Sequence, residues 1–70
     1  MKILVSYHAK LIQDREAFGQ IIINDAGRQA LTEDWVLELP DYIRNDPVTA
    51  GKLGYWIISV VVLNIVRLDG

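Results

Sequence analysis

Alternation of apolar and polar residues predicts a strand over residues 2–12. Its odd-numbered residues from 3 to 11 are apolar and its even-numbered residues are mainly polar, with Leu4 and Ile12 as exceptions. This two-residue period is typical of a strand with one buried face. A second apolar stretch, residues 18–24, has three consecutive isoleucines at its centre. The polar segment between the two stretches is short, so they are predicted to form an antiparallel hairpin.

Three independent signals place the start of a helix at residue 33. Thr32 can cap the helix, because its hydroxyl can accept a hydrogen bond from a free amide of the first turn. Glu33 and Asp34 place negative charge at the positive end of the helix dipole. Leu31 and Val36 have the spacing of a hydrophobic staple across that cap.

The predicted helix carries one apolar stripe with a period near 3.6 residues. The members of the stripe are Trp35, Val36, Leu39, Tyr42 and Ile43. Pro40 lacks a backbone N–H and clashes with the preceding turn, which costs about 3 kcal/mol in a regular helix. We therefore expect a kink, or two short helices of which the second begins at Pro40. Residues 45–47 should end the helix, and the glycine-containing segment 47–54 is predicted to be a loop or a short turn.

The last predicted strand, residues 56–68, is apolar on both faces. Strict alternation places on one face Trp56, Ile58, Val60, Val62, Val66 and Leu68, with Asn64 among them. It places on the other face Ile57, Val61, Leu63 and Ile65, with Ser59 and Arg67. One helix can cover only one face of a sheet, so the second face is a surplus apolar surface. The apolar run is also too short for a membrane helix, which needs about 20 residues.

These elements predict a single α+β domain over residues 1–70 with the order β-β-α-β. The favoured topology is a three-stranded antiparallel sheet with the first strand in the centre and the helix on one face. In the alternative topology the last strand lies parallel to the second strand, after a right-handed crossover.

Composition limits how such a small domain can be stabilised. The chain has 70 residues, no cysteine and one histidine, which excludes disulfides, thiolate metal sites and a histidine-rich metal site. No cofactor is predicted. A core of this size supports only a few kcal/mol, so self-association or a partner is expected to add stability. The lack of cysteine fits a cytoplasmic location.

Catalytic chemistry has one candidate pair, Ser6 and His8, with Asp14 or Glu16 to orient the imidazole ring. Two residues apart on a strand, they share a face. No oxyanion-hole or nucleophile-elbow pattern surrounds them, so we interpret them as part of a solvated strand face. We predict that the protein is not an enzyme.

Two surfaces are candidates for binding a partner. Residues 33–46 contain five acids and one arginine, a net charge of −4, and can attract a basic surface; the candidate residues there are Glu33, Asp34, Leu37, Glu38 and Asp41. The second candidate is the surplus apolar face of Ile57, Val61, Leu63 and Ile65, which together with Leu4 and Ile12 makes a patch large enough for an interface.

The surplus apolar face has three alternative interpretations. It can complete a core whose alternation is misassigned, form a homodimer, or leave an edge strand that pairs with another chain. Nucleic-acid binding through Lys2, Lys10 and Arg67 is a weaker alternative to protein binding, because the seven basic residues are scattered and the pI is near 5.

Four segments resemble small uncharacterised proteins of phages and prophages: residues 2–7 (KILVSY), 17–22 (AFGQII), 31–34 (LTED) and 60–68 (VVVLNIVRL). The similarity covers most of the chain. Many phage proteins of this size inhibit host defence, including anti-CRISPR proteins. The resemblance implies a partner among host defence proteins, such as a CRISPR–Cas component, in the host cytoplasm.

Overall fold

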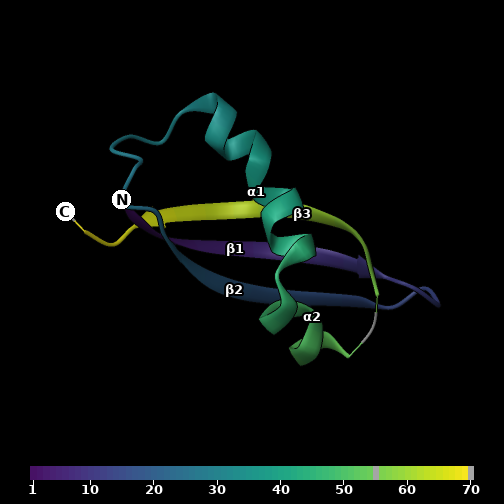
Figure 1. Ribbon diagram of the computed structural model, residues 1–70. Coiled ribbons are helices and arrows are strands. Elements are labelled where there is room, and N and C mark those ends of the chain that lie inside the picture. Colours follow the sequence, from purple (N-terminus) through teal and green to yellow (C-terminus); the bar gives the residue numbers. More distant parts are fainter. Residues whose placement is uncertain (55, 70) are drawn as a thin grey trace.

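Three strands form one antiparallel sheet with the order β2-β1-β3, and two helices pack against one side of it (Figure 1). The computed structural model describes residues 1–54 and 56–69. Along the chain the elements are β1 (Lys2–Leu11), β2 (Glu16–Asn24), α1 (Glu33–Asn45), α2 (Pro47–Leu53) and β3 (Ile57–Arg67). The predicted α+β class, the β-β-α-β order and the central first strand are confirmed.

The hairpin of β1 and β2 pairs Lys2 with Asn24 at one end and Lys10 with Glu16 at the other. β2 begins two residues earlier than predicted. At the turn, Gln13 and Asp14 both have positive φ angles, 64° and 56°. Positive φ at the central residues matches the turn to the right-handed twist of the flanking strands.

The helix start is confirmed at residue 33. The Thr32 hydroxyl oxygen accepts a hydrogen bond from the Trp35 amide at 3.3 Å. The expected division at Pro40 is wrong, because α1 continues through Pro40 to Asn45. Leu39 and Ile43, on either side of the proline, are both buried against the sheet, so tertiary packing holds both turns in place. Tyr42, expected in the buried stripe, is half exposed.

The segment predicted as a loop forms a second helix, α2. One carboxylate oxygen of Asp46 accepts hydrogen bonds from the Thr49 amide at 3.0 Å and the Thr49 hydroxyl at 2.7 Å. Pro47 occupies the first helical position, where its missing N–H costs nothing. Gly54 ends the helix in the left-handed conformation, with φ of 69°. These features start and end a helix, so the loop prediction is wrong.

Two register irregularities divide β3. Consecutive residues of β1 pair with Asn64 and then Val62, which leaves Leu63 without a partner in β1. In the same way, consecutive residues of β1 pair with Ser59 and then Ile57, which leaves Ile58 without a partner. Each extra residue reverses which side of the sheet the next residues face. The helix side therefore receives Ile57, Val60, Val62 and Ile65, and the opposite side receives Ser59, Val61, Asn64 and Val66.

The prediction that β3 has a surplus apolar face made of Ile57, Val61, Leu63 and Ile65 is therefore wrong. Ile57 is 6% exposed and belongs to the core, and Ile65 is half-buried against the core. Val61 lies on the other side of the sheet and is 55% exposed, and Leu63 is an exposed bulge residue. Strict alternation over residues 57–66 requires that no residue is inserted into the strand. Two extra residues, Ile58 and Leu63, break the alternation.

The core lies between the helices and the sheet. Its fully buried centre consists of Ile3, Val5, Leu39 and Ile43. Tyr7 is also buried, and its ring lies over Gly19, the residue opposite in β2. A Cβ atom on Gly19 would lie 2.5 Å from the Tyr7 hydroxyl oxygen. Glycine at position 19 is therefore required by the close approach of this ring.

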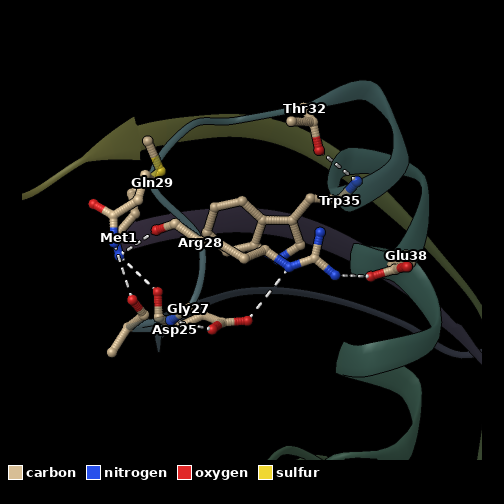
Figure 2. Close-up of polar contacts among 9 residues, drawn as sticks. Met1, Asp25, Gly27, Arg28, Gln29, Thr32, Trp35 and Glu38 are labelled. Carbon is tan, nitrogen blue, oxygen red and sulfur yellow. Dashed lines mark hydrogen bonds and ion pairs between the residues drawn. The ribbon is translucent and has the colours of Figure 1, made fainter.

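The connection between β2 and α1 is held by a polar cluster around Arg28 (Figure 2). The Arg28 guanidinium lies 2.6 Å from a Glu38 carboxylate oxygen and 3.4 Å from an Asp25 carboxylate oxygen. It also stacks over the buried Trp35 ring at 5.4 Å. The Met1 ammonium donates to the carbonyl oxygens of Asp25 and Arg28 at 2.6 and 2.7 Å. These contacts join β1, the connection and α1.

Candidate interaction surfaces

The side of the sheet opposite the helices carries three rows of side chains, each running across β2, β1 and β3. The register places Ile22, Leu4 and Val66 in one row, Gln20, Ser6 and Asn64 in the next, and Phe18, His8 and Val61 in the third. We call these nine residues the uncovered sheet face. Two rows are mainly apolar, and the row between them is polar.

The apolar rows are open to solvent. Phe18 is 75% exposed, and Ile22, Val61 and Val66 are each about half exposed. Large apolar side chains scattered singly on a surface are normal, but Ile22 and Val66 flank Leu4 in one row, and Phe18 and Val61 flank His8 in another row of the same sheet. The uncovered sheet face therefore has the composition of a binding surface, with apolar groups beside hydrogen-bonding groups.

Ser6 and His8 lie on this face together, as predicted. The Ser6 hydroxyl oxygen accepts a hydrogen bond from the side-chain Nε2 of Gln20 at 3.4 Å. His8 Nε2 lies 3.5 Å from a Glu16 carboxylate oxygen, and the His8 and Phe18 ring centroids are 4.9 Å apart. No hydrogen bond joins Ser6 to His8 within the described residues. The imidazole is thus oriented by Glu16 and Phe18 rather than toward the hydroxyl.

Of the predicted apolar patch, Leu4 and Val61 belong to the uncovered sheet face. Phe18, Gln20, Ile22, Asn64 and Val66 were missed. The hairpin register was the available signal, because pairing Lys2 with Asn24 places Ile22 beside Leu4 and Phe18 beside His8.

The second predicted surface is exposed on α1 and consists of Glu33, Asp34, Leu37, Glu38 and Asp41, which we call the acidic helix face. Leu37 is 68% exposed. Glu38 is paired with Arg28, and Asp46, the fifth acid of this segment, caps α2. Two of the five carboxylates therefore already have partners within the protein.

The basic residues of the nucleic-acid alternative do not share one face. Lys2 and Lys10 lie on the uncovered side of β1. Arg67 lies opposite Ile3 on the helix side, where its Nε is 3.4 Å from an Asp69 carboxylate oxygen. The pKa of the Asp69 carboxyl lies below its usual value, chiefly because this group accepts a hydrogen bond from the Lys2 backbone.

Residues 1–54 and 56–69 lack two further kinds of site. No group of three or more histidine or acidic side chains that could hold a metal ion occurs there. No helix in these ranges has the length and apolarity needed to cross a membrane.

No family model, curated protein or solved structure matches this chain.

Proposed function

We propose that this protein acts by binding another protein through the uncovered sheet face, without catalysis. The observation that carries the proposal is the pair of exposed apolar rows on a sheet whose other side is occupied by the helices. Burying apolar surface stabilises a complex by about 25 cal/mol per Å² before the costs of association. The polar row between them can fix the orientation of the partner through hydrogen bonds.

The acidic helix face has a supporting role in this proposal. Glu33, Asp34 and Asp41 are exposed on the opposite layer of the domain from the sheet face. Exposed charges of one sign attract a basic partner and raise the association rate more than the affinity. This role weakens as salt concentration rises, whereas apolar contacts on the sheet do not.

The resemblance to phage proteins suggests the class of partner. A host defence protein, such as a CRISPR–Cas component in the host cytoplasm, would be occluded by this small domain. This part of the proposal rests on the resemblance alone.

A homodimer is the second candidate. The side chains of Gln20 and Asn64 each carry a donor and an acceptor, and Ser6 carries both on one oxygen. Such a polar row can pair with the same row of a second copy when two sheets pack face to face, while the flanking apolar rows pack together.

The test uses two matched double variants. Phe18→Ser with Val61→Ser removes apolar surface from the uncovered sheet face, and Leu37→Ser with Asp41→Ser changes the acidic helix face. Light scattering across a range of concentrations first establishes the mass of the wild-type protein. Each variant is then used, with the wild type, to capture partners from host lysate, with circular dichroism as the control for folding.

We expect the sheet variant to lose its bound protein and the helix variant to retain it. Loss in the helix variant alone would refute the sheet assignment. A concentration-dependent dimer that the sheet variant abolishes would establish the second candidate in place of a foreign partner.

A further inference from the structure

A hollow of about 760 Å³ lies between the end of α1, α2 and the start of β3. It is lined by Arg44, Asn45, Ala50, Gly51, Gly54, Trp56 and Ile57. This volume lies within the range of small-molecule sites in proteins, which combine apolar walls with a few placed polar groups. The hollow is formed by the helical layer and the start of β3 and is separate from the uncovered sheet face.

Arg44 supplies the positive charge of the hollow. Its Nε donates to the Ile57 carbonyl oxygen at 3.3 Å, which fixes the plane of the guanidinium. Within the part of the chain that the structure describes, Arg44 forms no ion pair. Its two terminal amino groups are therefore available for a bidentate contact with an oxyanion.

Two carboxylates of the helical layer line a different depression. Asp41 and Asp46 contribute to a neighbouring hollow with Tyr42, Asn45 and Pro47. Neither carboxylate lines the larger hollow, and Asp46 is engaged in capping α2. Among the described residues, the lining of the larger hollow thus contains a cation and no anion, which favours a negatively charged ligand.

Trp56 supplies a flat apolar surface. Its side chain is 80% exposed, although its carbonyl oxygen is anchored by the Ile12 amide at 3.2 Å. A backbone held in place beneath an exposed indole provides a platform on which a planar ring can stack.

Gly51 gives independent support for a ligand. It lies inside α2, and apart from its chain neighbours and the backbone of α2 no atom lies within 4 Å of the place where a Cβ would stand. Its φ angle is not positive, so neither close packing nor backbone conformation requires glycine there. Glycine inside a helix lowers stability relative to alanine. What glycine preserves at position 51 is the open space of the hollow.

We propose that this hollow binds a small molecule that carries both a carboxylate or phosphate group and a planar ring. The oxyanion contacts the terminal amino groups of Arg44, the ring stacks on Trp56, and the Asn45 amide bonds a polar edge of the ligand. This site does not depend on the proposed protein partner.

The test titrates the protein with phenyl phosphate, adenosine 5′-monophosphate and phenylacetate up to millimolar concentration. Binding is followed by NMR through the amide of Gly51 and the indole N–H of Trp56, with the indole N–H of buried Trp35 as internal control. Phosphate and carboxylate ligands are distinguished by which compound binds. We expect saturable shifts at Gly51 and Trp56 but not at Trp35.

Three variants and one control variant test the residues responsible. Arg44→Gln should weaken binding about tenfold to a hundredfold, because it removes charge-assisted hydrogen bonds. Gly51→Ala should raise Tm by about 4–8 °C, and Gly51→Leu should abolish binding while remaining at least as stable as the wild type. Val48→Leu, on the same helix but outside the hollow, should bind normally.

Two results would overturn the proposal. One is the absence of saturable shifts with all three compounds, and the other is unchanged affinity in both Arg44→Gln and Gly51→Leu. Neither result would affect the capture experiment on the uncovered sheet face, and loss of that partner would leave this titration unchanged.

Discussion

The two sides of the sheet use the same three strands but have opposite environments. On β1 the residues facing the helices are Ile3, Val5, Tyr7, Ala9 and Leu11, all buried, whereas the residues between them face the uncovered side and are exposed or half-buried. On β3 both sides receive apolar residues, and only their position relative to the two bulges separates core from surface. Hydrophobicity alone therefore does not identify the core of this domain.

The largest expected effect contrasts two residues of β3. Ile57→Asp places a charge in the core without a partner and should lower the free energy of unfolding by about 4 kcal/mol or more, enough to unfold a domain of this size. Val61→Asp, on the uncovered side, should change it by about 0.5–1 kcal/mol. Urea unfolding measures both. Equal effects would mean that the two residues share a face and that the bulge at Ile58 between them is absent.

A similar contrast tests the helical layer that covers the core side. Leu39 is 1% exposed and Leu37 is 68% exposed, only two residues apart on α1. Leu39→Ala should destabilise by about 3 kcal/mol, because it removes buried methyl groups and leaves a cavity. Leu37→Ala should stay within about 0.5 kcal/mol. Comparable losses in thermal unfolding would show that α1 is rotated relative to the sheet.

A substitution at Gly19 tests the contact between β1 and β2 on the core side of the hairpin. Gly19→Ala should cost about 2 kcal/mol, because the new methyl group overlaps the buried Tyr7 ring. In a Tyr7→Leu background the same change should cost less, since the shorter side chain leaves room for the methyl group. A double-mutant cycle in urea measures this coupling. A coupling of zero would place the Tyr7 ring away from Gly19.

The smallest effect concerns α2. Asp46→Ala removes both bonds to Thr49 and should cost about 1 kcal/mol, whereas Asp46→Asn should retain most of the stability, because asparagine is also a good cap. Thermal unfolding with circular dichroism compares the two variants. Identical behaviour of Ala and Asn at this position would argue against the capping role.

Much of the fold could be predicted from local patterns. The alternation on β1 and the short polar turn were sufficient for the antiparallel hairpin, and Thr32, Glu33 and Asp34 were sufficient for the start of α1. The second helix could also have been predicted from the sequence. Asp46, Pro47 and Gly54 are a cap, a first-turn proline and a left-handed terminator, but proline and glycine were interpreted as loop residues.

The remaining features depend on contacts between distant segments. The bulges at Ile58 and Leu63 exist only in the pairing of β3 with β1, so a period-two pattern in one strand cannot locate them. The Arg28–Glu38 ion pair joins residues on either side of the Thr32 cap, and it neutralises part of the negative charge predicted for residues 33–46. The hollow beside Trp56 likewise forms only when α1, α2 and β3 meet.

The bulges of β3 also affect the tendency of this edge strand to aggregate. This edge strand is rich in valine and isoleucine, a composition that in a long, flat edge recruits further strands and begins a cross-β stack. Unpaired extra residues at Ile58 and Leu63 divide the strand into short segments and increase its local twist. An incoming chain therefore meets no long straight ladder, and an apolar strand can lie at the edge of the sheet without seeding a fibril.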